Sequence, residues 1–146
     1  MRTNISNVYA CGDIVSFPLA TFGNKPSNVQ HWQMALKHGR TAALSITKAN
    51  EPCHSVPFFW SVMFGKSLRY AGYGAGYDDC ILHGDVPGLA FVAYYFKNGQ
   101  LVAAASIGKD PAVAQIAELM RNGKHISVDA VKRNATDDWK PMLTSS

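Results

Sequence analysis

Cysteine and charge are both scarce in this sequence, and no apolar run is long enough to span a membrane. The three cysteines, Cys11, Cys53 and Cys80, form no C-x-x-C pair and have no histidines at zinc-finger spacing. We therefore expect reduced thiols in an intracellular protein, with neither a zinc site nor a disulfide framework. From the sequence we expect no signal peptide ahead of the fold.

The small charged fraction also restricts the class of partner. Charged residues make up 16% of the chain, the net charge is +4, and the basic residues are scattered without a block of one sign. A dedicated nucleic-acid module normally shows a basic stripe or stacking aromatics, so we do not expect nucleic acid as a partner. A length of 146 residues suits one domain, or one domain and a piece of another, with a sizeable core.

The beginning of the chain contains a candidate ligand site. Residues 8–11 (Val-Tyr-Ala-Cys) predict a short buried strand that leads into a Gly12-Asp13 turn. Ligands of open α/β sheets often bind beyond such strand ends. Gly12 lets a ligand approach the backbone, and Asp13 offers two acceptor oxygens to its hydroxyl groups. A plain turn dipeptide explains the same residues equally well.

A helix is expected next. Ser27 and Gln30 have the spacing of a capping box and predict a helix from there to about Thr47 or Lys48. Its first turn, with Gln30, His31 and Trp32, would attract anionic or carbonyl oxygen. An apolar stripe at helical spacing predicts its buried face: Val29, Trp32, Ala35, Leu36, Gly39, Ala43 and Ile46.

Residues 49–54 resemble a linker, and the pattern beyond them changes to strands. Strands are expected over residues 56–64, 68–73, 77–82, 89–96 and 101–106. Asn98-Gly99 between the last two predicts a tight hairpin.

The remaining residues predict helices. Asp110-Pro111 predicts an N-cap and a first helical residue, and Asn122-Gly123 predicts the end of that helix. Its apolar face would comprise Val113, Ile116, Ala117 and Met120. Ser127 would cap a short helix over residues 128–132, and a flexible tail would begin at about residue 134, with Trp139 and Met142 as possible docking points. The fold class expected from Pro52 onward is therefore α+β, an antiparallel sheet followed by helices.

Three blocks of the sequence resemble one family. Residues 3–13 match T-x6-A-x-G-D, the second flavin-binding motif of pyridine-nucleotide–disulfide-type oxidoreductases. Residues 30–35, with Gly39-Arg40, resemble the flavin-facing helix of ferredoxin-reductase-like enzymes, and residues 56–61 resemble the opening of their C-terminal reductase domain. Residues 63–74 are most similar to the apoptosis-inducing-factor-like, Rieske-containing mitochondrial branch of that family.

The resemblance implies a C-terminal piece of an FAD-dependent NAD(P)H oxidoreductase. Residues 1–52 would be the last strand and helix of an α/β FAD-binding domain, and residues 53–146 the C-terminal reductase domain. The family also needs an N-terminal G-x-G-x-x-G unit, which is not in this sequence, and Gly72-x-Gly74-x-Gly76 has the wrong spacing. We therefore expect FAD in the full-length protein but not in this piece, which alone would be inactive.

The resemblance also implies site residues. Asp13, with Gly12, would bind the ribityl chain, and the start of the helix would face the pyrimidine end of the flavin. Trp60 would cover the flavin edge, although ordinary core packing explains it nearly as well, and a structural role is the commoner one for a lone histidine such as His31. No catalytic residue and no metal site is expected. The implied cofactor-binding residues are Gly12, Asp13, Gln30, His31, Trp32 and Trp60.

A second hypothesis comes from another class of function. The C-terminal domain could act as a dimerisation or protein-interaction module with no catalysis of its own. The partners expected under the two hypotheses are NAD(P)H and an electron acceptor for the full-length enzyme, and a second copy of the chain for the module. By resemblance, the location would be mitochondrial.

Overall fold

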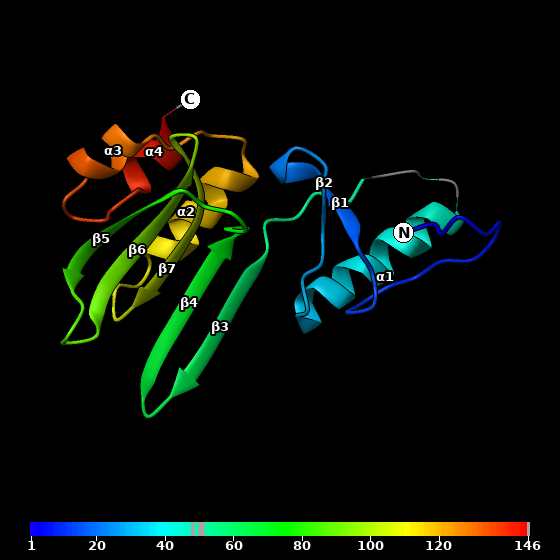
Figure 1. The fold of residues 1–146 in the computed structure, drawn as a ribbon, viewed down its shortest axis with the longest axis horizontal. Coiled ribbons are helices and arrows are strands. Elements are labelled where there is room, and N and C mark those ends of the chain that lie inside the picture. The colour runs from blue at the N-terminus through cyan, green and yellow to red at the C-terminus, as the bar shows by residue number, and fades with distance from the viewer. Residues whose placement is uncertain (48, 50–51, 146) are drawn as a thin grey trace. The chain divides into compact units, whose positions relative to one another are not determined.

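The structure is a computed structural model that describes residues 1–47, 49 and 52–145. The chain divides into two compact units, Met1–Pro57 (unit 1) and Phe58–Ser146 (unit 2) (Figure 1). The boundary expected from the sequence falls five residues earlier, after residue 52. Lys48, the expected helix end, and Asn50 and Glu51 of the expected linker lie outside the described residues.

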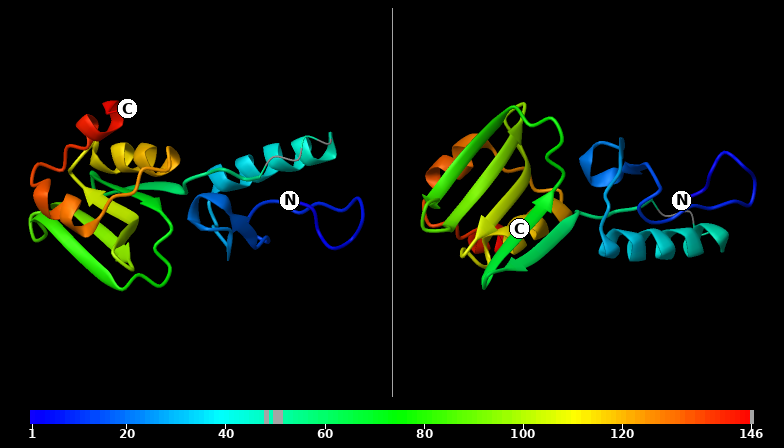
Figure 2. Two further views of the ribbon diagram at one scale, coloured as in Figure 1. Left: turned by 90° about the horizontal axis from the view of Figure 1, so that it is seen from above. Right: turned by 60° about the horizontal axis from the view of Figure 1, so that its bottom comes forward.

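Unit 2 is built on a five-stranded antiparallel sheet in the order β3-β4-β7-β6-β5. Its helices gather on one face of that sheet (Figures 1 and 2). This arrangement confirms the α+β class expected from the sequence. The strands are β3 (Phe58–Met63), β4 (Lys66–Gly72), β5 (Asp79–Asp85), β6 (Ala90–Lys97) and β7 (Gln100–Ile107).

Local turn chemistry sets the register of the central hairpin. Lys97 pairs with Gln100, so Asn98 and Gly99 alone connect β6 to β7. Their φ angles are 50° and 75°, the left-handed values of a type I′ turn. The predicted hairpin is confirmed.

The helix α2 (Ala112–Arg121) supplies most of the layer above the sheet. Val113, Ile116 and Leu119 are fully buried in one cluster with Val92, Tyr94, Phe96 and Ala104 of the sheet. The predicted apolar face is confirmed at Val113 and Ile116, while Ala117 and Met120 are partly buried against the same cluster and Leu119 was not predicted. The predicted end of the helix at Asn122 is confirmed. The predicted start is wrong: Pro111 is the N-cap residue, and the Asp110 carboxylate binds the Arg69 guanidinium instead of capping the helix.

Residues 134–145 pack onto the domain where the sequence led us to expect a tail. The helix α3 (Val128–Arg133) precedes them, capped as predicted by Ser127, whose hydroxyl accepts the Ala130 N–H at 3.2 Å. The helix α4 (Lys140–Thr144) follows Trp139, which is 1% exposed in the main core. Burial of this one large aromatic side chain holds an otherwise polar segment in place.

Asp137 adds polar contacts to this attachment. Its buried carboxylate accepts the Tyr94 hydroxyl at 2.5 Å, and the same oxygen lies 2.7 Å from His83 Nδ1. The Trp139 indole N–H also points to the Tyr94 oxygen, at 3.4 Å. The C-terminal segment is therefore fixed by a hydrogen-bonded cluster as well as by apolar packing.

Unit 1 contains the hairpin β1 (Phe17–Leu19) and β2 (Lys25–Ser27), the short 3-10 helix η1 (Ala20–Phe22) between them, and the helix α1 (Trp32–Ile46). The strand predicted over residues 8–11 does not form, and Tyr9 makes a single bridge with Arg2. A buried strand needs neighbouring strands to satisfy its backbone groups. In the part of the chain that the structure describes, residues 8–11 have only that one bridge.

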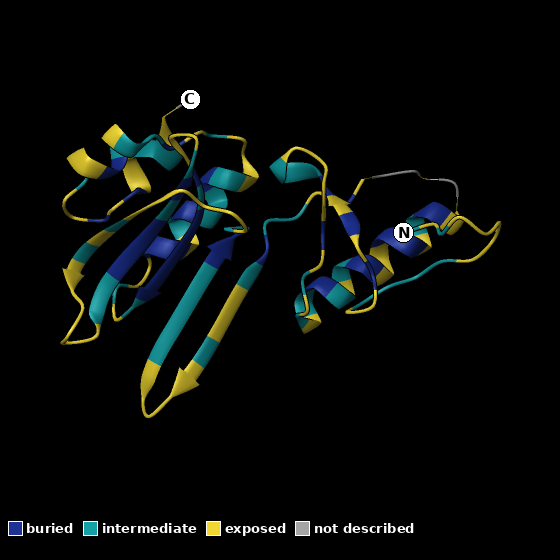
Figure 3. Cartoon of the chain, in the orientation of Figure 1, coloured by how far each residue is buried: buried dark blue, intermediate teal, exposed yellow. Residues whose placement is uncertain are grey.

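The helix α1 differs from its prediction at its start and in its buried face. Ser27 ends β2 with its hydroxyl on the Lys25 carbonyl, so it caps nothing, and the helix begins after His31. The apolar stripe expected to be buried is mostly exposed, with Leu36 at 64% and Ile46 at 60% (Figure 3). The side chains that the helix does bury are Met34, His38, Thr41, Ala42 and Ser45.

No helix within the described ranges has the length and apolar character needed to cross a membrane.

Candidate functional site

The Gly12–Asp13 turn is held against α1. The Gly12 N–H donates to His38 Nδ1 at 3.2 Å. Gly12 has a φ of 84°, which favours glycine, and a Cβ there would meet the Ala35 Cβ at 3.8 Å. Conformation, more than lack of space, therefore calls for glycine at this position. Because its N–H is already used by His38, Gly12 has no backbone donor left for a ligand.

His38 is a residue of this site that the sequence did not reveal. Its side chain is fully buried and packs edge-on against Phe17, with ring centroids 4.3 Å apart. Removal from water lowers the pKa of the imidazole below its ordinary 6.5. Nδ1 accepts a hydrogen bond, so the neutral ring carries its proton on Nε2, for which no partner is found among the described residues.

Asn28 connects the same turn to the approach of the helix, and the sequence did not single it out either. Its side-chain amide donates to the backbone oxygens of Asp13 and Val15, each at 2.8 Å. The Gln30 amide donates to the Asn28 side-chain oxygen at 3.0 Å. The structure thus brings together three of the predicted residues, Gly12, Asp13 and Gln30, through His38 and Asn28.

The N-terminus of α1 follows Asn28 and Gln30 in the chain and is the positive end of the helix dipole. His31 is its N-cap residue, Trp32 is its first helical residue, and the first turn contains no acidic side chain. The two rings lie 6.0 Å apart, and Trp32 is 58% exposed. The first backbone N–H groups of any helix have no partner within the helix, and with the dipole they favour electron-rich oxygen.

The donor set of unit 1 can be tested against a flavin nucleotide. Asp13 is exposed, so its carboxylate is accessible to solvent. Its backbone oxygen accepts a hydrogen bond from the Asn28 amide, which fixes the backbone at this position. A carboxylate accepts hydrogen bonds from sugar-alcohol hydroxyl groups, and the start of α1 suits a carbonyl oxygen that gains negative charge. These residues fit the ribityl and pyrimidine parts of FAD, except that Gly12 contributes its conformation and not its N–H.

Trp60 belongs to unit 2 and is described there alone. It lies on β3 opposite Arg69, is 38% exposed, and has its ring centroid 6.3 Å from that of Phe58. It is therefore partly exposed and does not belong to the central core cluster. Its place at a flavin edge stays a prediction.

The glycine-rich stretch after β4 has a structural explanation. Gly72 has a φ of 97°, and a Cβ there would lie 2.2 Å from the Val102 carbonyl oxygen of β7. The Gly74 N–H donates to the Tyr70 hydroxyl at 2.9 Å. These glycines allow close strand packing and do not open a helix.

The other chemistry considered from the sequence concerns thiols and metals. Cys11, Cys53 and Cys80 are all free thiols, as expected. Within the described ranges, no three His, Cys, Asp or Glu side chains are grouped so that they could hold a metal ion.

Comparison with known proteins gives this architecture a class. The family model described as Reductase C-terminal matches residues 58–141, which start at the first residue of unit 2. The chain belongs to the Reductase C-terminal family.

Individual relatives extend the similarity into unit 1. Apoptosis-inducing factor 3 of Mus musculus is 48% identical over 126 residues, covering 86% of this chain and 21% of that protein. A ferredoxin–NAD(P)(+) reductase of Sphingomonas sp. is 31% identical over 103 residues, covering 70% of this chain and 25% of the relative. This chain thus spans about a fifth to a quarter of the length of these relatives.

The fold has counterparts among solved structures. The ferredoxin reductase for the CYP199A2 system of Rhodopseudomonas palustris superposes with a TM-score of 0.78 at 24% identity. The match covers 92% of this chain and 33% of that one. It shows a shared fold.

Proposed function

We propose that this chain acts as the C-terminal part of an FAD-dependent NAD(P)H oxidoreductase. The observation that carries the proposal is the joining of the Gly12–Asp13 turn to α1 through His38 and Asn28. Two sequence blocks that resemble flavin-binding segments are thereby held in one small structure. The Reductase C-terminal domain follows them in the chain, as the family resemblance implies.

The residues of the chain would bind and orient the cofactor. Asp13 would accept hydrogen bonds from the ribityl hydroxyl groups, and the start of α1, with His31 and Trp32, would stabilise negative charge at the pyrimidine end. Trp60 would exclude water from one edge of the ring system. When bound, FAD supplies the ability to accept a hydride from NAD(P)H and to release electrons to an acceptor.

The partners follow from the same proposal. NAD(P)H would be the donor, and the names of relatives, ferredoxin–NAD(P)(+) reductase among them, support a ferredoxin-like acceptor. The similarity to apoptosis-inducing factor 3 supports a mitochondrial location for the full-length protein. Imaging of that protein with a C-terminal tag, against a mitochondrial dye, would test the location.

A chimera tests the flavin site. The segment of mouse apoptosis-inducing factor 3 that matches this chain would be replaced by this chain, and the purified product examined for visible flavin absorbance and for NAD(P)H-dependent reduction of ferricyanide. We expect a yellow, active chimera, while the 146-residue chain alone stays colourless. Asp13→Ala should remove most of the flavin, and Asp129→Ala, on α3 of unit 2, should not. A folded chimera without FAD, or full flavin retention in Asp13→Ala, would contradict the proposal.

A second candidate, self-association, is favoured by the exposed face of α1. Leu36 and Ile46 lie on that face with about three-fifths of their surface exposed. Apolar patches of this kind mark contact sites or association liabilities. Light scattering of the 146-residue chain should then show a dimer at high concentration, which Leu36→Lys converts to a monomer. A wild-type chain that stays monomeric would exclude this candidate.

A further inference from the structure

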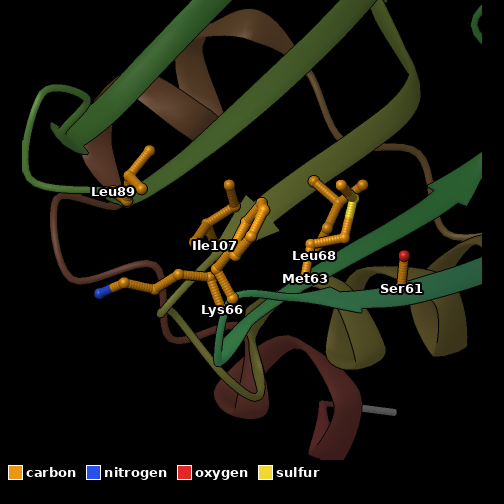
Figure 4. A pocket seen from close by; sticks show the side chains of 7 residues that line it. Ser61, Met63, Lys66, Leu68, Leu89 and Ile107 are labelled. Atoms are coloured by element: carbon orange, nitrogen blue, oxygen red, sulfur yellow. The ribbon is translucent and has the colours of Figure 1, made fainter.

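Unit 2 carries an apolar groove on the face of its sheet that α2 does not cover. Leu68 and Ile107 pair across β4 and β7 and form its floor. Each lies three positions from a core residue, Ala71 or Ala104, and residues an odd number apart in a strand point to opposite faces. The groove has a volume of about 330 Å³, and Met63 and Ser61 of β3 extend its lining (Figure 4).

Two bulky residues at the groove adopt left-handed backbone conformations. Phe64, in the turn between β3 and β4, has a φ of 50° and is 99% exposed. Leu89, in the turn between β5 and β6, has a φ of 54° and is 41% exposed. Left-handed conformations are rare for bulky side chains, and such strain clusters at functional sites.

A second hairpin of the same sheet shows whether the turn conformation at Phe64 requires a bulky residue. The hairpin at Asn98-Gly99 has φ angles of 50° and 75°, and the hairpin at Phe64-Gly65 has 50° and 71°. The φ angles are nearly the same, yet one turn uses asparagine, which tolerates them, and the other uses an exposed phenylalanine. The turn therefore does not require Phe64, and its side chain calls for another explanation.

The polar groups of the groove define what it would bind. Only Ser61 and Lys66 contribute polar side chains to the lining, and Figure 4 shows the Lys66 side chain extending from the strand with its nitrogen outermost. No carboxylate of the described residues forms an ion pair with Lys66. A cation at the rim of an apolar groove complements a ligand with an apolar body and one negative charge.

We propose that the groove binds a single medium-chain fatty acid. Its acyl chain would lie on Leu68 and Ile107 between Phe64 and Leu89, and its carboxylate would pair with Lys66. The volume is at the small end of ligand pockets, ~300–1,000 Å³, which suits one chain and not a folded partner. This site is separate from the proposed flavin residues, so either proposal can fail without the other.

Binding is tested with dodecanoate on the 146-residue chain. Dodecanoate, below its micellar concentration, should displace a dansyl-labelled fatty acid, and dodecanol should be weaker by about fivefold, the scale of one surface ion pair. Lys66→Met should remove that difference, while Lys132→Met on α3 should preserve it. No displacement by dodecanoate, or equal displacement by dodecanol in the wild type, would overturn the proposal.

Two further variants test the groove without threatening the fold. Phe64→Asn and Leu89→Asn place a residue that tolerates the left-handed conformation in each turn, so the melting temperature should stay equal or rise. Each should weaken dodecanoate binding by about tenfold through lost apolar contact. Undiminished binding in both variants, or binding to phosphatidylserine vesicles with none to monomeric dodecanoate, would refute the site.

Discussion

The main helices of the two units, α1 and α2, treat their apolar residues in opposite ways. Unit 2 buries Val113, Ile116 and Leu119 of α2 against a sheet of the same unit. Unit 1 leaves Leu36 and Ile46 exposed on a helix whose polar His38 is buried. The apolar face of α2 is covered within the chain, whereas that of α1 is left exposed and suits contacts with something further. We infer that unit 1 is the part whose structure depends more on additional partners.

A matched pair of leucines gives the largest expected contrast. Leu119→Ala, at a fully buried position, should lower the free energy of unfolding of unit 2 by about 2–5 kcal/mol because it leaves a cavity. Leu36→Ala, at a position that is 64% exposed, should change unit 1 by less than about 0.5 kcal/mol. Urea denaturation, followed by hydrogen exchange resolved to each unit, measures both. Equal losses would remove the contrast between the units.

The Tyr94–Asp137 hydrogen bond should matter less than the leucine but more than any surface contact. Asp137→Ala leaves a buried tyrosine hydroxyl with a weaker set of partners, at a cost of about 1–3 kcal/mol, and also places alanine at a φ of 57°. Asp137→Asn, which tolerates that conformation, should cost less. Tyr94→Phe combined with Asp137→Asn should separate the lost hydrogen bond from the backbone effect. If the alanine variant matches the wild type in urea, the cluster does not fix the C-terminal segment.

The units should also respond to opposite extremes of pH. Burial lowers the pKa of His38, so unit 1 keeps this contribution to stability above about pH 6.5 and loses it as the pH falls. Burial, with the hydrogen bond to Asp137, raises the pKa of Tyr94 above 10, so unit 2 keeps its contribution below that pH and loses it as the pH rises. Each group can change stability by at most ~1.4 kcal/mol per pH unit.

Exchange measurements across pH can assign these slopes. His38→Gln should flatten the acid side of the stability–pH profile of unit 1 alone. Tyr94→Phe should flatten the alkaline side of the stability–pH profile of unit 2 alone. A slope that survives its variant would mean that other groups produce it.

The smallest effect is expected at the Arg69–Asp110 pair. Both side chains are partly exposed, at 32% and 50%, so solvent screens their attraction. Asp110→Asn should lower the free energy of unfolding of unit 2 by less than about 1 kcal/mol. Because salt screens the same ion pair, 0.5 M salt should lower the free energy of unfolding of the wild type by no more than this substitution does. A larger loss on thermal melting would show that Asp110 has a second role at the start of α2.

Unit 2 could be predicted well from sequence because short motifs define its turns and helix caps. The residues that pack against one another in its core also lie in this chain. Asn98-Gly99 specifies its own turn, and Ser127 caps the helix that follows it. The tail was misjudged because one tryptophan, Trp139, outweighs a polar composition. Asp110 was misassigned because Arg69, 41 residues away in sequence, competes for its carboxylate.

Unit 1 was harder to predict for a physical reason. The apolar residues 8–11 and the stripe on α1 have a pattern that predicts burial, but periodicity cannot say whether the covering surface lies in the same chain. His38 was missed because a buried histidine cannot be recognised from its spacing alone. The structure links Gly12, Asp13 and Gln30 through His38 and Asn28, and their cofactor role stays a proposal.

Burial of Trp139 has a consequence for synthesis. The strands β3 to β7 and the helix α2 emerge from the ribosome before residue 139 does, and domains tend to fold as their residues emerge. Until Trp139 leaves the exit tunnel, the Tyr94 hydroxyl and the apolar surface around it have no cover. Nascent unit 2 therefore completes its core only after residue 139 has emerged.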